Sequence, residues 1–163
     1  MNDVTIRAAV AEDAAVIAGF ANQFNALEGK SAELYTEALV RAHAFGPEPA
    51  FAALVAEQDG APVGYATFHN SFDSDRAMRT VWLLDLFVME QARGQGIGQR
   101  LMAAVARAAV ERGAGSLWWG VRSDNARARR FYARLGAVDD DARILELAGD
   151  ALRALADTET GSA

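Results

Sequence analysis

Hydrophobic positions along the chain form two kinds of pattern, a helical repeat and short apolar runs beside a turn. From Glu12 to Leu27 apolar residues return every three or four positions, which is the spacing of an amphipathic helix. Further along, two apolar runs flank the turn Gln58-Asp59-Gly60. Because Asp-Gly favours a tight reversal, these runs are expected to form an antiparallel hairpin.

The same criteria give a complete set of expected elements. Strands are predicted at Val4–Arg7, Ala50–Glu57, Ala61–His69, Val81–Met89, Ser116–Val121 and Arg143–Leu147, with a loop at Asn70–Arg79. Helices are predicted at Glu12–Leu27, at Ser31–Phe45, from Ile97 to a cap at Gly113, from Ser123 or Asp124 to the residue before Gly136, and at Ala151–Ala156.

Strands alternate with helices only in the second half of this order, because the first half holds a hairpin and two helices. We therefore expect an α+β (mixed α/β) fold with a central mixed β-sheet flanked by helices. A length of 163 residues suits one domain. We assign this domain to residues 1–157 and expect the small, polar tail 158–163 to be flexible.

Composition narrows the possible chemistry and partners. The chain has no cysteine, which excludes disulfides, thiolate metal sites and a cysteine-bound acyl intermediate. The sequence shows neither a membrane-spanning apolar run nor a signal-peptide pattern, so we expect a cytoplasmic protein. A net charge of −6 argues against binding to nucleic-acid backbones. We accordingly expect no nucleic-acid, membrane or metal partner.

A glycine-rich turn, Arg93-Gly94-Gln95-Gly96-Ile97-Gly98, joins the strand Val81–Met89 to a helix. Glycines at alternate positions, followed by the free N–H groups of a helix N-terminus, form a site for an anion such as pyrophosphate. The spacing does not match the dinucleotide-binding pattern G-x-G-x-x-G. A P-loop is excluded as well, because Gln99-Arg100 stands where Lys and Ser or Thr are needed.

Two segments carry a family resemblance. The first is Arg93-x-x-Gly96-x-Gly98, overlapped by Gln91-x-x-Gly94-x-Gly96, and it resembles the acetyl-CoA signature of the GNAT N-acetyltransferase superfamily. The second, Asn125-x-x-Ala128-x-x-Phe131-Tyr132-x-Arg134-x-Gly136, is similar to that superfamily's other hallmark. The resemblance implies a sheet in which two neighbouring parallel strands splay apart to hold acyl-CoA.

The resemblance also implies which residues bind acetyl-CoA as cosubstrate. Pantetheine amides would bond to the backbone of the strand, and the pyrophosphate would bond to the turn, where Arg93 adds positive charge. The implied cofactor-binding residues are Leu86, Phe87, Val88, Arg93, Gly94, Gln95, Gly96, Ile97, Gly98, Asn125, Ala128 and Phe131. Asn125 has a plainer interpretation as part of a helix cap.

Two residues are candidates for proton transfer. In the family pattern Tyr132 protonates the departing thiolate, although its helical spacing also suits a core aromatic. Asp85 is a lone carboxylate on an apolar strand and acts either as base or relay for the acceptor amine or as a structural anchor.

The pattern is most similar to the diamine and thialysine acetyltransferase branch, from which it departs at one position. That branch commonly carries a Glu-Asp pair on this strand, and Leu84 stands where the glutamate would be. Acidic residues from segments that flank the acceptor cleft in this family are Glu28, Glu33, Glu37, Asp73 and Asp75.

The sequence therefore predicts direct acetyl transfer from acetyl-CoA to the primary amine of a small cationic molecule. Two alternatives remain: a protein N-terminal or lysine acetyltransferase, and a non-catalytic acyl-CoA-binding module on the same fold. The resemblance further implies a homodimer.

Overall fold

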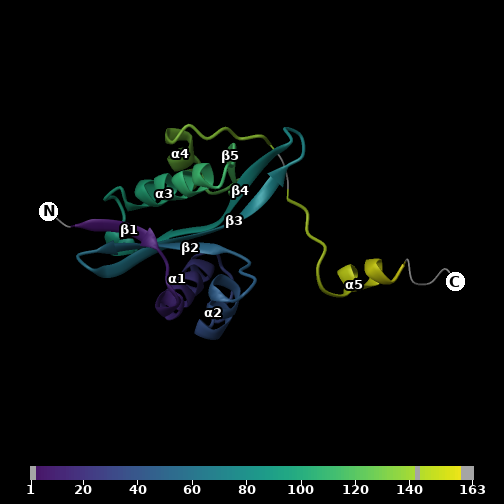
Figure 1. Cartoon of the computed structure of the whole chain (residues 1–163), viewed down its shortest axis with the longest axis horizontal. Coiled ribbons are helices and arrows are strands. Elements are labelled where there is room, and N and C mark those ends of the chain that lie inside the picture. The colour runs from purple at the N-terminus through teal and green to yellow at the C-terminus, as the bar shows by residue number, and fades with distance from the viewer. Residues whose placement is uncertain (1–2, 142–143, 159–163) are drawn as a thin grey trace. The chain divides into compact units, whose positions relative to one another are not determined.

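The computed structural model describes residues 3–141 and 144–158 (Figure 1). The chain divides into two compact units, with the boundary in the sequence between Gly120 and Val121. The first unit contains a five-stranded sheet in the order β1-β2-β3-β4-β5. Its strands are β1 (Val4–Ala8), β2 (Ala52–Gln58), β3 (Ala61–Asp73), β4 (Met78–Val88) and β5 (Ser116–Trp119). Neighbours from β1 to β4 are antiparallel, and β4 and β5 are parallel, so the predicted mixed sheet is confirmed.

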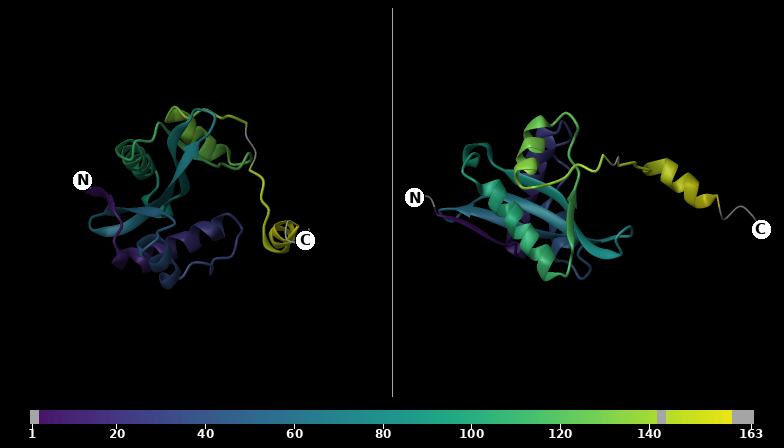
Figure 2. Two further views of the ribbon diagram at one scale, coloured as in Figure 1. Left: turned by 45° about the vertical axis from the view of Figure 1, so that its right-hand side comes forward. Right: turned by 90° about the horizontal axis from the view of Figure 1, so that it is seen from above.

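Helices cover both faces of this sheet. Figures 1 and 2 show α1 (Ala14–Leu27) and α2 (Glu37–Phe45) on one face and α3 (Ile97–Glu111) on the other. Short helices η1 (Ala11–Asp13) and η2 (Glu90–Ala92) precede α1 and follow β4. The core beneath α1 is aromatic, since Phe20, Tyr65 and Phe87 are nearly or fully buried with ring centroids 5.5 to 6.2 Å apart.

The second unit contains α4 (Ala126–Arg134) and α5 (Gly149–Asp157). The start predicted for α4, at Ser123 or Asp124, is wrong. Asn125 is the N-cap residue, because its side-chain oxygen accepts a 3.0 Å hydrogen bond from the backbone N–H of Ala128.

The helix predicted at Ser31–Phe45 is wrong in its first half. Thr36 caps α2 by accepting a hydrogen bond from the backbone N–H of Leu39. The preceding segment is held by tertiary contacts, because the side chain of Asn22 on α1 donates to the backbone oxygen of Tyr35 and accepts from its backbone N–H. A side chain on one element therefore fixes the irregular backbone of another, which helical periodicity does not reveal.

The loop predicted at Asn70–Arg79 is also wrong. Strands β3 and β4 continue through it as a hairpin, with Asn70 opposite Val81 and Asp73 opposite Met78. The carboxylate of Asp73 is buried and accepts hydrogen bonds from the backbone N–H groups of Asp75 and Arg76, so it closes the turn. A polar composition therefore reflected an exposed hairpin end.

Near the C-terminus the predictions are partly confirmed. Helix α5 contains the predicted Ala151–Ala156, and β5 ends at Trp119 instead of Val121. Of the strand predicted at Arg143–Leu147, residues 144–147 are not extended into a strand, and Arg143 lies outside the described residues. The predicted tail, apart from Thr158, also lies outside them. Among the described residues, no helix has the length and apolar character needed to cross a membrane.

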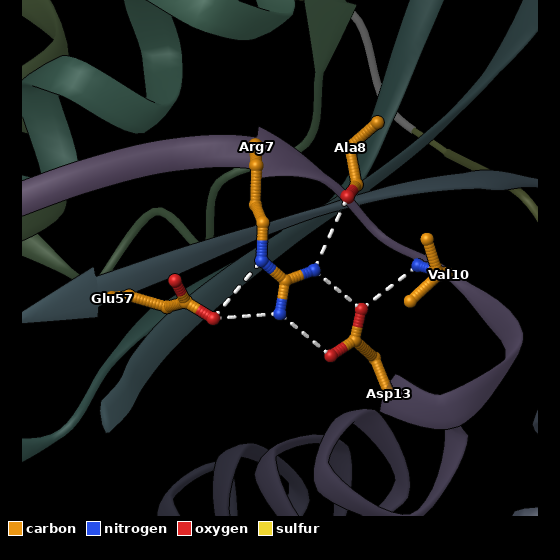
Figure 3. Close-up of polar contacts among 5 residues, drawn as sticks. All are labelled: Arg7, Ala8, Val10, Asp13 and Glu57. Carbon is orange, nitrogen blue, oxygen red and sulfur yellow. Dashed lines mark hydrogen bonds and ion pairs between the residues drawn. The ribbon is translucent and has the colours of Figure 1, made fainter. Parts of the chain in front are cut away.

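A partly buried ion-pair network ties β1, β2 and η1 together (Figure 3). The guanidinium of Arg7 donates to Asp13 at 2.6 and 2.8 Å and to Glu57 at 2.7 and 2.9 Å. Asp13 also accepts from the backbone N–H of Val10 at 2.8 Å. Hydrogen bonds from Arg7 lower the pKa of Asp13, because they stabilise its charged form.

We expect Asp13→Asn to lower the free energy of unfolding by about 1–2 kcal/mol at neutral pH. Because folding depresses the pKa of Asp13, its contribution is complete above the ordinary value of 3.8 and disappears as pH falls through the folded-state value. Urea denaturation over a pH series measures this. The control is Glu37→Gln, which breaks an exposed pair with Arg41 and should change stability little. A deficit for Asp13→Asn that stays constant with pH would contradict the prediction.

Candidate active site

Strand β4 loses its neighbour halfway along. Pairing with β5 covers four residue pairs, from Thr80 with Ser116 to Leu83 with Trp119. Beyond Leu83, β4 continues for another five residues paired only with β3 among the described strands. Leu86, Phe87 and Val88, whose backbone was predicted from the sequence to bind an amide-bearing cofactor, lie in this part of β4, which has β3 on one side and no strand of the described chain on the other.

A β-bulge lies at the same point on β4. Phe68 of β3 pairs with Leu83 and the adjacent Thr67 pairs with Asp85, so Leu84 is the extra residue. In a regular strand, adjacent side chains alternate between faces. Here both Leu84 and Asp85 border the same pocket.

This pocket is built by elements from one face of the sheet and by the segment before α2. Its lining residues are Ile17, Tyr35, Phe51, Tyr65, Thr67, Leu84 and Asp85. Asp85 is the only carboxylate in this lining. Its lining residues from β4, Leu84 and Asp85, directly follow Leu83, the last residue of β4 that pairs with β5.

Asp85 accepts a 2.8 Å hydrogen bond from the hydroxyl of Tyr65. Burial raises the pKa of Asp85, whereas the Tyr65 hydrogen bond and the positive charge of Lys30 act in the opposite direction. Burial and the charge of Asp85 both raise the pKa of Tyr65, which therefore remains a hydrogen-bond donor. A carboxylate with a raised pKa beside a pocket suits proton acceptance near neutral pH.

As a structural anchor, Asp85 would accept hydrogen bonds from backbone N–H groups. In the described chain, its carboxylate accepts a hydrogen bond from the Tyr65 side chain and not from a backbone N–H. The bond also satisfies the hydroxyl of Tyr65, whose residue is fully buried. The carboxylate is thus fixed at one oxygen, Oδ2, by a single side chain.

Sequence reasoning missed Tyr65 and Tyr35 as site residues. Alternation along β3 places Tyr65 and Thr67 on one face, but the bulge decides that Asp85 shares it. Tyr35 reaches the pocket because the side chain of Asn22 holds the backbone of Tyr35 by two hydrogen bonds. Burial and the charge of Asp85 both raise the pKa of Tyr35. No local sequence signal identifies either contact.

The glycine turn has the backbone geometry that the sequence required. Gly94 and Gly96 have φ angles of 80° and 78°, and a Cβ placed on either would meet nothing within 4 Å. Gly96 is the N-cap of α3, so the first N–H groups of that helix follow directly after it. Ile97 is buried in the core, and its side chain anchors this helix end. Open space and free N–H groups fit a bulky anion such as a pyrophosphate.

Arg93 braces this turn. Its Nε atom donates a 2.9 Å hydrogen bond to the backbone oxygen of Val88, which connects the end of β4 to the glycine segment. Gln95 is also tied down, because its side-chain oxygen accepts from Gln58 of β2 at 2.7 Å. The predicted residues from Asp85 to Gly98 therefore form one continuous strand, turn and helix start.

The remaining predicted site residues lie together on or beside α4 in the second unit. Asn125 caps this helix, so its side-chain oxygen is already used by Ala128. The rings of Phe131 and Tyr132 meet edge to face with centroids 5.1 Å apart. Burial raises the pKa of Tyr132, which keeps its phenol protonated at neutral pH.

The five acidic residues expected near the acceptor do not line the pocket. Asp73 closes its hairpin turn, and Glu37 pairs with Arg41 on an exposed face of α2. The negative charge in the pocket lining is therefore that of Asp85 alone.

Comparisons with known proteins agree with this geometry. The model of the acetyltransferase (GNAT) family matches residues 11–137. Thialysine N-epsilon-acetyltransferase of Bos taurus is 34% identical over 133 residues, covering 74% of this chain and 78% of the relative. The uncharacterized N-acetyltransferase YhfO of Bacillus subtilis is 33% identical over 138 residues, covering 84% of this chain and 91% of the relative.

Solved structures show the same fold. An integron cassette protein from V. cholerae superposes with a TM-score of 0.78 at 25% identity, covering 95% of this chain and 98% of the other. The aminoglycoside N-acetyltransferase AAC(6')-Iy in complex with CoA gives a TM-score of 0.75 at 19% identity, covering 90% of this chain and 95% of the other. With the family match, these likenesses establish that the chain belongs to the GNAT acetyltransferase family and is an acetyl-CoA-dependent N-acetyltransferase.

Proposed function

We propose that the protein acetylates the primary amine of a small cationic molecule, which it holds against Asp85 in the pocket beside β4. The observation that carries this proposal is the position of Asp85, which borders a pocket at the point where β4 loses β5. Two relatives named for acetylating small amines support it: the thialysine enzyme above and L-ornithine N5-acetyltransferase NATA1 of Arabidopsis thaliana. The second is 37% identical over 93 residues, which cover 56% of this chain and 41% of that protein.

Asp85 solves the main chemical problem of the acceptor. An alkylamine with a pKa near 10.4 is almost entirely protonated at neutral pH and is then not a nucleophile. Asp85 attracts the ammonium and accepts its proton, directly or through water, as the nitrogen attacks the thioester carbonyl. Because the chain has no cysteine, the acetyl group passes directly to nitrogen without a thioester on the protein.

Tyr132 completes the proton balance in this proposal. The carbon–sulfur bond breaks as the amide forms, and the Tyr132 hydroxyl gives its proton to the departing thiolate. The ammonium loses two protons in all. Asp85 takes the first and releases it to solvent, and water takes the second as the tetrahedral intermediate collapses to the amide. Solvent then returns a proton to the Tyr132 phenolate. The proposal rests on the match of residues 125–136 to the family hallmark and on the protonated state of this phenol.

For the cosubstrate, we assign the pantetheine amides to the backbone of Leu86, Phe87 and Val88. The pyrophosphate is assigned to the backbone N–H groups of Gly94–Gly98, with Arg93 holding the turn to β4. Asn125, Ala128 and Phe131 are assigned to the same cofactor on the hallmark match alone.

The domain extent, the cellular location and the partners are part of the same proposal. We assign residues 1–157 to a single acetyltransferase domain, since the family match runs from 11 to 137 across both compact units. We also propose a homodimer, from the family resemblance, and no nucleic-acid partner, from the net charge of −6. A cytoplasmic location without a membrane partner is proposed from the sequence, which shows neither a membrane-spanning apolar run nor a signal-peptide pattern.

The cofactor assignment predicts a specific effect at Gly96. An alanine there must adopt a φ near 78°, which costs about 1–2 kcal/mol and shifts the turn away from its N–H geometry. We expect Gly96→Ala to weaken acetyl-CoA binding by about tenfold or more in calorimetry. Gly113→Ala is the matched control, because Gly113 has φ 74° in equally open space after α3. Equal affinity in both variants would refute the assignment.

The mechanism predicts a kinetic signature at Tyr132. Free CoA release should reveal turnover with small cationic amines, and Tyr132→Phe should lower kcat by about 10²–10⁴-fold. The affinity for acetyl-CoA should stay nearly unchanged, because proton donation acts only as the thiolate leaves. If Tyr132→Phe turns over at the parent rate, Tyr132 only packs its helix. A parent without turnover on any amine would favour a non-catalytic module, and turnover on peptides alone would favour a protein acetyltransferase.

The Asp85–Tyr65 pair predicts coupled pH profiles. Tyr65 lowers the pKa of Asp85, so Tyr65→Phe should raise it and move the acid limb of kcat/KM to higher pH. Asp85→Asn should lose kcat/KM most near neutral pH and recover at high pH, where the amine is already neutral. In the Asp85→Asn background, Tyr65→Phe should no longer shift the profile. A shift that persists in the double variant would assign Tyr65 an effect independent of Asp85.

A further inference from the structure

The wall of the acceptor pocket beside Asp85 is apolar. Leu84 borders the pocket and is 45% exposed, although leucine is usually buried. Ile17 and Phe51 add further apolar surface, and the other polar lining groups are hydroxyls of Tyr35, Tyr65 and Thr67. This is a site with one charged anchor and an uncovered hydrophobic surface next to it.

The bulge makes residue 84 part of the recognition surface. Without an extra residue in β4, position 84 would point to the opposite face from Asp85. With the bulge present, residue 84 lines the same pocket as Asp85. The residue type at this position therefore decides whether a second negative charge is available there.

The charges around Asp85 disfavour a second cation. On the segment after α1, Lys30 carries a positive charge that acts on Asp85, and the groups from β3 and from the segment before α2 are the neutral phenols Tyr65 and Tyr35. An acceptor with two ammonium groups would place one against Asp85. It would leave the other against an apolar wall or near Lys30, where an unpaired charge is costly.

We propose that Leu84 determines acceptor specificity and that the pocket selects a monoamine with an apolar body, an alkylamine or arylalkylamine, over a diamine. The inference rests on the proposed function, because it places the acceptor in the pocket beside Asp85. Beyond that function, it specifies that the part of the acceptor away from the amine is apolar and that Leu84 recognises this part.

The test compares n-pentylamine with cadaverine, which differ only in a second terminal amine. Free CoA release gives kcat/KM for each with the full-length parent, Leu84→Glu and Leu84→Gln. Glutamate and glutamine have nearly the same shape, so their difference isolates the negative charge. Thermal unfolding of each variant confirms that the protein remains folded.

We expect the parent to favour n-pentylamine by about tenfold or more in kcat/KM. Leu84→Glu should reverse this preference, because the added carboxylate pairs with the second ammonium. Leu84→Gln should lose activity with n-pentylamine without gaining activity with cadaverine.

Two results would overturn the inference: a parent that prefers cadaverine, or a ratio of the two substrates that is the same in all three proteins. Either can occur while the parent still turns over acetyl-CoA with amines. Failure of the specificity inference is therefore distinct from failure of the proposed function, which would show as no turnover with any amine.

Discussion

The site depends on a single constraint in the sheet, which is that β4 and β5 pair over only four residue pairs. A parallel pair needs both strands to satisfy their backbone groups, so the end of β5 at Trp119 leaves the following part of β4 with one free edge. The bulge at Leu84 lies at this same position and brings two adjacent side chains to one pocket. Strand geometry thus generates both the edge to which we assign the cofactor and the wall to which we assign the acceptor.

Two aspartates in the first unit, Asp13, which is buried, and Asp85, which is partly buried, show how surroundings determine function. Asp13 has a charged partner in Arg7, and the hydrogen bonds from that partner lower its pKa. Asp85 has a neutral partner in Tyr65, and burial raises its pKa. The first carboxylate stabilises the junction of β1, β2 and η1, whereas the second is suited to exchange a proton. Their difference comes from partners supplied by other elements.

Membership of the GNAT family explains the parts of the molecule that are shared with other family members. It does not explain acceptor specificity, which depends on a few side chains. The strand, glycine turn and α3 lie within the stretch that matches the family, and they are the elements to which we assign acetyl-CoA. The acceptor pocket depends on residues from α1, the segment before α2, β3 and β4. Among them is Leu84, which stands where the diamine branch commonly carries a glutamate. The fold is shared with the family, and we propose that acceptor specificity depends on side chains such as this one.

The sequence by itself determined the features that depend on local spacing. These include the helical face of α1, the reversal at Asp59-Gly60, the left-handed glycines before α3 and the two family hallmarks. Period and turn chemistry are local properties, so a short stretch of residues is sufficient to predict them.

Only the tertiary structure decided the contacts that cross between elements. The hairpin beyond Asn70, the late start of α2 and the pairing of Tyr65 with Asp85 each depend on a partner distant in sequence. The bulge at Leu84 is of the same kind, because it exists only in the register between two strands. The sequence of one strand does not specify how that strand pairs with its neighbour. The surroundings of Asp85, and therefore its chemistry, depend on the register between β3 and β4.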